Sequence, residues 1–274
     1  MINKTVDLYE YYGLVKPEGA KAILEVIAYD KFGYCPNRKR PAMLVIAGGG
    51  YGSVSDREKD CIAFYYLNKG YNTFTLNYSV NPVHFPAQLI EACMAMAYIK
   101  ENAEELSIIS DKIAAVGFSA GGHLCGMLAT MTEEKEVKAA LKEKAENLAP
   151  NAVILSYPVI SSFVNPHVGS INNLSGGDQS VIDRISIERN VDKNSPPAFI
   201  WGTLNDQVVP SDNAFEIAKA YKASGIPFEF HMFENGHHGL SLGTKEVNTV
   251  NESIQPWLDL SITWLKGRGF DITD

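Results

Sequence analysis

The chain has 274 residues, of which 46% are hydrophobic, and it carries a formal net charge of −8. This length suits one large α/β domain, and the apolar residues can supply its core. The acidic balance, without any stripe of Lys and Arg, argues against a nucleic-acid partner. No apolar run reaches transmembrane length, and Met1–Glu10 lacks the apolar centre of a signal peptide. We therefore expect a cytoplasmic protein that does not bind membranes.

Short apolar runs typical of strands alternate along the chain with helical patterns. Several of these runs are continuously apolar, as expected for strands that are covered on both faces. The predicted strands are Ile23–Tyr29, Ala42–Ala47, Tyr71–Tyr78, Ile113–Phe118, Ala152–Tyr157, Ala198–Trp201 and Phe228–Phe233. This alternation predicts an α/β protein, with a mostly parallel central sheet and helices on both faces. No linker divides the chain, so we expect a single domain over residues 1–274.

Three segments between these strands have the pattern of helices. Ser55 and Glu58 form a capping box, which predicts a helix that begins there and ends at Gly70. Ala87–Asn102 places apolar side chains on one face, and Ala214–Tyr221 repeats the i, i+3, i+4, i+7 spacing of a helix that packs on a sheet. These helices are expected to cover the predicted sheet.

Residues 158–196 interrupt this alternation with many Pro, Gly, Ser and Asn residues. The composition predicts an irregular insertion that leaves the end of one strand and returns at the next. Loops at the carboxyl ends of parallel strands are where ligands bind. Two interpretations stay open: a long surface loop, or a cap that shapes the substrate site.

A run of three glycines and a tyrosine, Gly48–Tyr51, follows the strand Ala42–Ala47. Without side chains in the way, backbone N–H groups in such a run can point at a substrate oxygen. Together with the N–H of Ala120, those of Gly49 and Gly50 are candidates for an oxyanion hole. An ordinary turn or a phosphate-binding loop is the alternative. However, no Gly-Lys-Ser/Thr follows, and the Gly-x-Gly-x-x-Gly spacing is not met.

The most informative motif is the Gly-x-Ser-x-Gly pattern at residues 117–121, which places Ser119 between a predicted strand and a predicted helix. This context is that of the nucleophile elbow of hydrolases. Flanking glycines let the strand and the helix approach closely while the serine sits in a strained turn. The alternative is a glycine-rich turn whose serine merely caps the helix.

A serine nucleophile needs an acid to orient its base, and Asp206 stands just after the strand Ala198–Trp201. An aspartate there can reach the carboxyl edge of the sheet and accept a hydrogen bond from an imidazole. Four other acids compete less well. Two lie in the insertion, one fits the start of a helix and one precedes a strand at the wrong end: Asp178, Asp183, Asp212 and Asp192.

The base is expected after the last strand, where His237 and His238 follow Phe228–Phe233. This position completes the chain order Ser, Asp, His, but spacing alone does not choose between the two neighbours. The remaining histidines lie in a strand, on the predicted elbow helix or in loops: His231, His123, His84 and His167. A His pair can also bind metal, but no further ligand set completes a site. We therefore expect neither a metal nor a cofactor.

With these residues in place, the chain resembles the α/β-hydrolase superfamily, in particular its small esterase/lipase-like branch with acetyl esterases and xylan-esterase-like proteins. Ala47–Tyr51 is similar to the His-Gly-Gly-Gly-aromatic oxyanion motif of that branch, with Ala47 in place of the histidine. The segment 205–210 is similar to the acid segment. The closing Glu-x-Gly-x-His-Gly pattern at 234–239 selects His238 as the base.

The resemblance implies a serine esterase that acts on small or short-acyl esters, including acetylated sugars, through an acyl-enzyme intermediate. It implies a triad of Ser119, Asp206 and His238, and an oxyanion hole of Gly49, Gly50 and Ala120. The expected partner is a small-molecule ester, and the oligomeric state stays open. The alternatives are a peptidase or amide hydrolase on the same fold, and a hydrolase-fold binding protein without catalysis. The second alternative is disfavoured because such proteins typically lack a triad residue.

Overall fold

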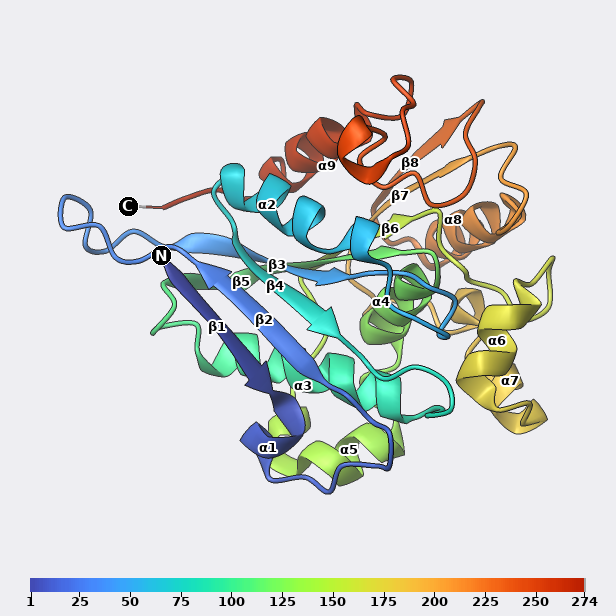
Figure 1. The fold of residues 1–274 in the computed structure, drawn as a ribbon, viewed down its shortest axis with the longest axis horizontal. Coiled ribbons are helices and arrows are strands. Elements are labelled where there is room, and N and C mark those ends of the chain that lie inside the picture. The colour runs from blue at the N-terminus through green and yellow to red at the C-terminus, as the bar shows by residue number, and fades with distance from the viewer. Residues whose placement is uncertain (274) are drawn as a thin grey trace.

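Eight strands form one sheet in the computed structural model, which describes residues 1–273 (Figure 1). Their order across the sheet is β1-β2-β4-β3-β5-β6-β7-β8. The strands are β1 (Ile2–Asp7), β2 (Ile23–Ala28), β3 (Arg40–Ile46), β4 (Asn72–Asn77), β5 (Ile108–Phe118), β6 (Ala152–Ser156), β7 (Ala198–Thr203) and β8 (Phe228–Phe233). β2 is antiparallel to both of its neighbours, and all pairs from β4 to β8 are parallel. The predicted α/β class with a mostly parallel sheet is confirmed.

Helices cover both faces of the sheet (Figure 1). On one face lie α2 (Asp60–Asn68) and α9 (Trp257–Lys266). The other face carries α1 (Leu8–Tyr12), α3 (Ala87–Glu101), α4 (Ala120–Thr130), α5 (Lys135–Leu141) and α8 (Asp212–Ser224). The remaining helical segments are η1 (Asp56–Glu58), η2 (Lys142–Ala145), α6 (Val168–Ser175), α7 (Gln179–Arg184), η3 (Ile187–Arg189) and η4 (Lys245–Val247). Within residues 1–273, no helix is both long and apolar enough to cross a membrane.

The continuously apolar strands are buried on both faces because successive side chains point in opposite directions. In β5, Ile113 and Ala115 enter the core beneath α3 and α4, whereas Val116 and Phe118 enter the core beneath α2 and α9. Parallel pairing with β3 on one side and β6 on the other holds this strand in the middle of the sheet. The core on each face therefore fixes the end of β5, which Ser119 directly follows.

The structure corrects the predicted capping box. Helix α2 begins at Asp60, after the single 3-10 turn η1, and Ser55 makes no side-chain capping bond. Glu58 is instead 2% exposed and turns inward, where its carboxylate accepts hydrogen bonds from elsewhere in the fold. The prediction was wrong because a buried partner for Glu58, distant in sequence, outweighed the local cap.

The insertion at residues 158–196 is more regular than its composition suggested, since it contains α6, α7 and η3. It leaves the carboxyl end of β6 and returns before β7, as expected. The Asn213 side chain fixes its start by accepting hydrogen bonds from the N–H groups of Ile160 (2.9 Å) and Ser161 (3.0 Å). The insertion is therefore anchored to α8 at the edge of the sheet where the predicted site residues lie.

Candidate active site

Ser119 occupies a sharp turn between β5 and α4, with φ of 53° and ψ of −120°. This is a strained conformation for a residue with a side chain. Glycines make the turn feasible: a Cβ on Gly117 would lie 2.3 Å from the Gly121 carbonyl oxygen, and one on Gly121 would lie 2.2 Å from that of Ile46. The motif thus folds as a nucleophile elbow, because only glycine allows β3, β5 and α4 to approach this closely.

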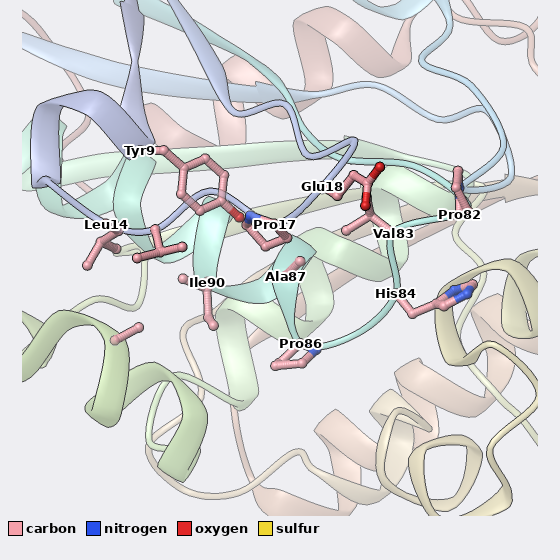
Figure 2. A pocket seen from close by; sticks show the side chains of 12 residues that line it. Tyr9, Leu14, Pro17, Glu18, Pro82, Val83, His84, Pro86, Ala87 and Ile90 are labelled. Atoms are coloured by element: carbon pink, nitrogen blue, oxygen red, sulfur yellow. The ribbon is translucent and has the colours of Figure 1, made fainter.

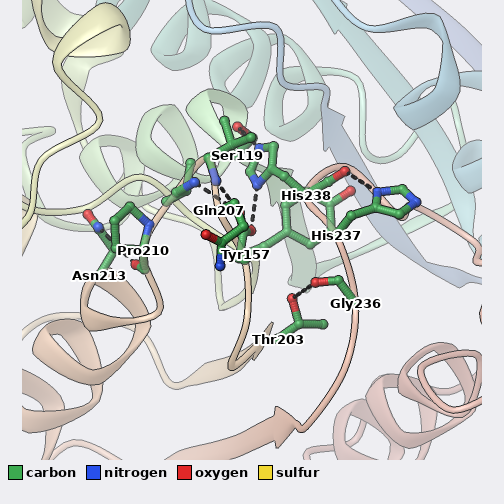
Figure 3. A network of polar contacts seen from close by, with 12 residues as sticks. Ser119, Tyr157, Thr203, Gln207, Pro210, Asn213, Gly236, His237 and His238 are labelled. Atoms are coloured by element: carbon green, nitrogen blue, oxygen red, sulfur yellow. Dashed lines mark hydrogen bonds and ion pairs between the residues drawn. The ribbon is translucent and has the colours of Figure 1, made fainter.

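The three polar side chains predicted to act together form a continuous hydrogen-bonded chain. The Ser119 hydroxyl donates to His238 Nε2 at 2.7 Å, and His238 Nδ1 donates to Asp206 Oδ2 at 2.7 Å. Ser119 follows β5, Asp206 follows β7 and His238 follows β8, so parallel strands bring all three to one edge of the sheet. Figure 3 shows the imidazole of His238 directed at Ser119. This arrangement can remove the hydroxyl proton of Ser119 as it attacks a carbonyl.

Asp206 is held in place by its own loop and shielded from water. Its Oδ1 accepts hydrogen bonds from the N–H groups of Val208 (2.9 Å) and Val209 (3.0 Å), which leaves Oδ2 for the imidazole. The carboxyl group is buried, with its side chain 2% exposed. Such fixation keeps the imidazole in one orientation and in the Nδ1–H tautomer.

The other candidate acids have local roles. Asp178 caps the first turn of α7, and Asp212 is the first residue of α8. The side chains of Asp183 and Asp192 accept hydrogen bonds from Gln179 and Asn194 in their own turns. None of these four carboxylates bonds to a histidine.

His238 and its neighbour His237 make different contacts in the structure. His237 is exposed, and its Nδ1 contacts only the His238 carbonyl oxygen, at 2.8 Å. In Figure 3 its ring lies on the side of His238 away from Ser119. His231 pairs with Glu229 on β8 at 2.7 Å, and His84 donates to the Asn173 carbonyl at 2.9 Å. Among the histidines of residues 1–273, only His238 bonds to Ser119.

A cleft of ≈ 310 Å³ opens above Ser119 and His238. The glycine loop after β3 forms one wall and His167 of the insertion contributes to the rim. Within residues 1–273, the backbone N–H groups of Gly49 and Gly50 have no hydrogen-bond acceptor, whereas that of Gly48 donates to Glu58. The N–H of Ala120 begins α4, where the first amides of a helix lack an internal acceptor. These groups are free to bind a substrate oxygen.

Hydrogen bonds hold the glycine loop in place, although Ala47 replaces the histidine of the His-Gly-Gly-Gly-aromatic motif. The Ala47 carbonyl accepts from the Tyr78 hydroxyl at 2.7 Å, and the Gly50 carbonyl accepts from the Asn173 amide of α6 at 2.9 Å. Tyr51 bonds through its hydroxyl to His123 Nδ1 at 2.9 Å. The loop is therefore bonded to Tyr78, which directly follows β4, to α4 and to the insertion without an imidazole at position 47.

His123 is fully buried beneath this loop and links it to the insertion. Its Nε2 contacts the Ile185 carbonyl at 2.8 Å, so the neutral ring donates there and accepts from Tyr51 at Nδ1. Burial lowers the pKa of His123 to about 4. The ring stays neutral near pH 7 and serves as a fixed connector rather than as a proton carrier. Its two partners, Tyr51 and Ile185, lie far from it along the chain.

Glu58 and Tyr157 form a buried bridge that the sequence analysis missed. Glu58 Oε2 accepts from the Gly48 N–H at 2.8 Å, and its Oε1 accepts from the Tyr157 hydroxyl at 2.7 Å. The Tyr157 oxygen accepts from the Ser241 N–H at 3.0 Å, and the tyrosine ring packs edge-on against His238 with centroids 5.1 Å apart. Burial raises the pKa of Glu58. This bridge joins the glycine loop to the segment that carries His238.

Replacing Glu58 by glutamine should break one end of this bridge, because the amide keeps one acceptor oxygen and presents an N–H₂ group to the other donor. We expect kcat for a short-chain nitrophenyl ester to fall roughly ten- to hundredfold, with KM little changed, since misplacing reacting groups by about 1 Å can cost about a hundredfold in rate. The free energy of unfolding should fall by about 1–3 kcal/mol, as one buried donor loses its acceptor. Steady-state kinetics and chemical denaturation measure both effects.

The control for this variant is Glu143→Gln, which changes an exposed carboxylate in η2 in the same way. It should leave kcat and stability at wild-type values. Wild-type kcat in Glu58→Gln, or an equal loss in Glu143→Gln, would show that the bridge does not position the site.

A larger cavity, of ≈ 460 Å³, lies between the N-terminal segment and the start of α3 (Figure 2). Its lining is mainly apolar, with Leu14, Val83 and Ile90 among its residues. Two of its polar groups are already bonded: the Tyr9 hydroxyl donates to Glu91 and His84 to a backbone carbonyl. It shares no lining residue with the cleft above Ser119. Among residues 1–273, no cluster of three His, Cys, Asp or Glu side chains could hold a metal.

Comparison with known proteins points to one family. The sequence model of the BD-FAE family matches residues 34–221, which include the glycine loop, Ser119 and Asp206. The chain is 36% identical over 78% of its length to endo-1,4-beta-xylanase B of Butyrivibrio fibrisolvens, and 28% identical over 79% to the acetylxylan esterase of Xylanibacter ruminicola. It spans 36% and 45% of the lengths of these two relatives.

The fold is also similar to that of solved structures along its whole length. The acetyl ester-xyloside bifunctional hydrolase of Caldicellulosiruptor lactoaceticus superposes with a TM-score of 0.83, at 28% sequence identity. The match covers 98% of this chain and 97% of that protein. The family match ends before β8, so the assignment of His238 rests on the hydrogen bonds described above.

Proposed function

This chain belongs to the BD-FAE family, and we propose that it is a serine carboxylic-ester hydrolase for small, short-acyl esters, with acetylated sugars as its substrates. The observation that carries this proposal is the unbroken chain of hydrogen bonds from Ser119 through His238 to Asp206. The acetylxylan esterase and the acetyl ester-xyloside hydrolase among its relatives support the choice of acetyl esters.

In the proposed mechanism, His238 Nε2 takes the hydroxyl proton as Ser119 Oγ attacks the ester carbonyl. The carbonyl oxygen gains negative charge, which the N–H groups of Gly49, Gly50 and Ala120 stabilise. The tetrahedral intermediate collapses, the C–O bond to the alcohol breaks, and His238 returns its proton to the leaving alcohol. Asp206 stabilises the imidazolium while it exists.

The second half of the proposed reaction repeats these steps with water. His238 takes a proton from the water, whose oxygen attacks the acyl-serine carbonyl, and then returns the proton to Ser119 Oγ as the acid leaves. No cofactor takes part in either half.

We further propose that the chain acts as one α/β-hydrolase domain in which residues 158–196 serve as a cap. Two contacts support this role: His167 lines the cleft and Asn173 binds the Gly50 carbonyl. Burial and the nearness of His238 lower the pKa of His167. Its Nδ1 accepts from the Ser170 N–H at 3.3 Å, so the neutral ring has an Nε2–H for a substrate oxygen.

A panel of nitrophenyl esters, from acetyl to octanoyl, tests this function together with acetate release from acetylated xylo-oligosaccharides. We expect kcat/KM to be highest for acetyl and to fall about tenfold or more by octanoyl, since a small acyl pocket penalises each added methylene. The acetylated sugars should release acetate. Faster cleavage of an acetyl nitroanilide than of the acetyl ester would favour an amide hydrolase, and no turnover of any ester would favour a binding protein.

A further inference from the structure

We propose that Arg57 forms a subsite for a carboxylate on the alcohol part of the ester, so that the preferred substrates are anionic esters. This inference rests on the proposed ester hydrolysis and adds the chemical class of the alcohol. Arg57 belongs to η1 and lines the same cleft as Ser119, His167 and His238.

The guanidinium of Arg57 interacts with the neighbouring Glu58 and Tyr157 through its charge alone. It is exposed, and within residues 1–273 it makes no ion pair, side-chain hydrogen bond or stacking contact with a ring. Four other arginines each contact a carboxylate or an aromatic ring: Arg40, Arg184, Arg189 and Arg268. The adjacent Glu58 is buried and its two carboxylate oxygens already accept from Gly48 and Tyr157. Arg57 is therefore available to an anion from outside.

Hydrogen bonds fix the backbone of Arg57 beside the cleft. Its carbonyl accepts hydrogen bonds from the Ser241 hydroxyl and from Cys61 Sγ. Its side chain lies directly over Gly239, where an added Cβ would come within 3.1 Å of the Nη2 atom. The guanidinium therefore lies beside Gly239, the residue that follows His238.

This position corresponds to the alcohol side of the ester. The leaving alcohol must lie next to His238, because His238 gives it a proton. Arg57, beside Gly239, is on that side of the cleft. Of the residues that line the cleft, Arg57 is the one with an exposed permanent charge, and the chain as a whole carries −8. A guanidinium binds carboxylate through two parallel N–H bonds, which gives both affinity and geometry.

The test compares two acetyl esters of the same shape, acetoxybenzoate and acetoxybenzamide, in their 3- and 4-substituted forms. The measured quantity is the ratio of kcat/KM for the carboxylate to that for the amide. Because each variant is compared through this ratio, intrinsic differences in ester reactivity cancel. We expect Arg57→Gln to lower the ratio about tenfold for at least one ring position, mainly through KM. Arg57→Lys should give an intermediate ratio, because lysine keeps the positive charge but cannot donate two parallel N–H bonds to a carboxylate.

Lys222→Gln is the matched control, since it removes one exposed positive charge near the end of α8. It should leave the ratio at the wild-type value, and thermal unfolding of all variants checks their fold. An unchanged ratio in Arg57→Gln, or an equal fall in Lys222→Gln, overturns the subsite. If wild type hydrolyses both esters and Arg57→Gln leaves the ratio unchanged, the carboxylate subsite is wrong and the proposed function stands. If wild type hydrolyses neither these esters nor nitrophenyl acetate, the proposed function itself is wrong.

Discussion

Ser119→Ala will lower kcat for a short-chain nitrophenyl ester by roughly 10⁴- to 10⁶-fold and abolish the burst of nitrophenol. The expected size follows from serine hydrolases in which loss of the nucleophile leaves only oxyanion and binding effects. Without Oγ, His238 Nε2 has no hydroxyl partner and no covalent bond to the acyl group can form. Stopped-flow kinetics with enzyme at high concentration measures both the burst and the steady state.

The control for this variant is Ser53→Ala, which removes another hydroxyl that lines the same cleft, two residues after the glycine loop. Its hydroxyl makes only a long contact, 3.4 Å, with the Gly49 carbonyl. It should keep the burst. A full burst in Ser119→Ala would mean that another group is the nucleophile and that the elbow merely shapes a turn.

His238→Ala should be almost as damaging as the loss of Ser119, whereas His237→Ala should change kcat by no more than about twofold. The neighbours differ in one respect that matters: His238 bonds to both Ser119 and Asp206, and His237 bonds to neither. Because the residual rate depends on a weak unassisted nucleophile, it should rise with pH in His238→Ala. The pH–rate profiles of both variants on the same ester measure these effects.

The adjacent pair makes this comparison internally controlled, since both substitutions remove an imidazole from one loop. The opposite outcome, a nearly inactive His237→Ala with an active His238→Ala, would reverse the assignment. Equal losses in both variants would point to disruption of the loop, and thermal unfolding of each variant distinguishes that case.

Much of the fold could be predicted because its strands are short apolar runs that are buried on both faces. The apolar runs in β3, β5 and β7 were enough to predict these strands. β1 was missed, because it is an edge strand with alternating exposed residues and charges. The helix predicted to begin at Ser55 begins at Asp60 instead. A capping box describes only local hydrogen bonds, whereas the Glu58 carboxylate accepts from Gly48 and Tyr157.

The triad residues were predictable for a related reason. Each follows a parallel strand, so chain order and strand ends place Ser119, Asp206 and the pair His237 and His238 at one edge of the sheet. The choice of His238 over His237 needed the closing motif, and the structure adds the hydrogen bonds to that choice. Their roles in catalysis stay predictions until the variants are measured.

The supporting groups could not be predicted, because each depends on contacts between segments distant in sequence. Glu58 joins Gly48 to Tyr157, and His123 joins Tyr51 to Ile185. A sequence pattern reports which residues are near each other along the chain, not which side chains meet across the fold. The one available signal was that Tyr157 ends a predicted strand, where site residues gather in parallel sheets.

Covalent labelling of Ser119 tests the central claim most directly. The protein is treated with a fluorophosphonate, digested, and analysed by mass spectrometry for the position of the phosphonyl group. We predict one modification per chain, on the peptide that contains Ser119, formed in step with the loss of esterase activity and absent in Ser119→Ala. Modification of a different residue, or full inactivation while Ser119 stays unmodified, would contradict the assignment of Ser119 as the nucleophile.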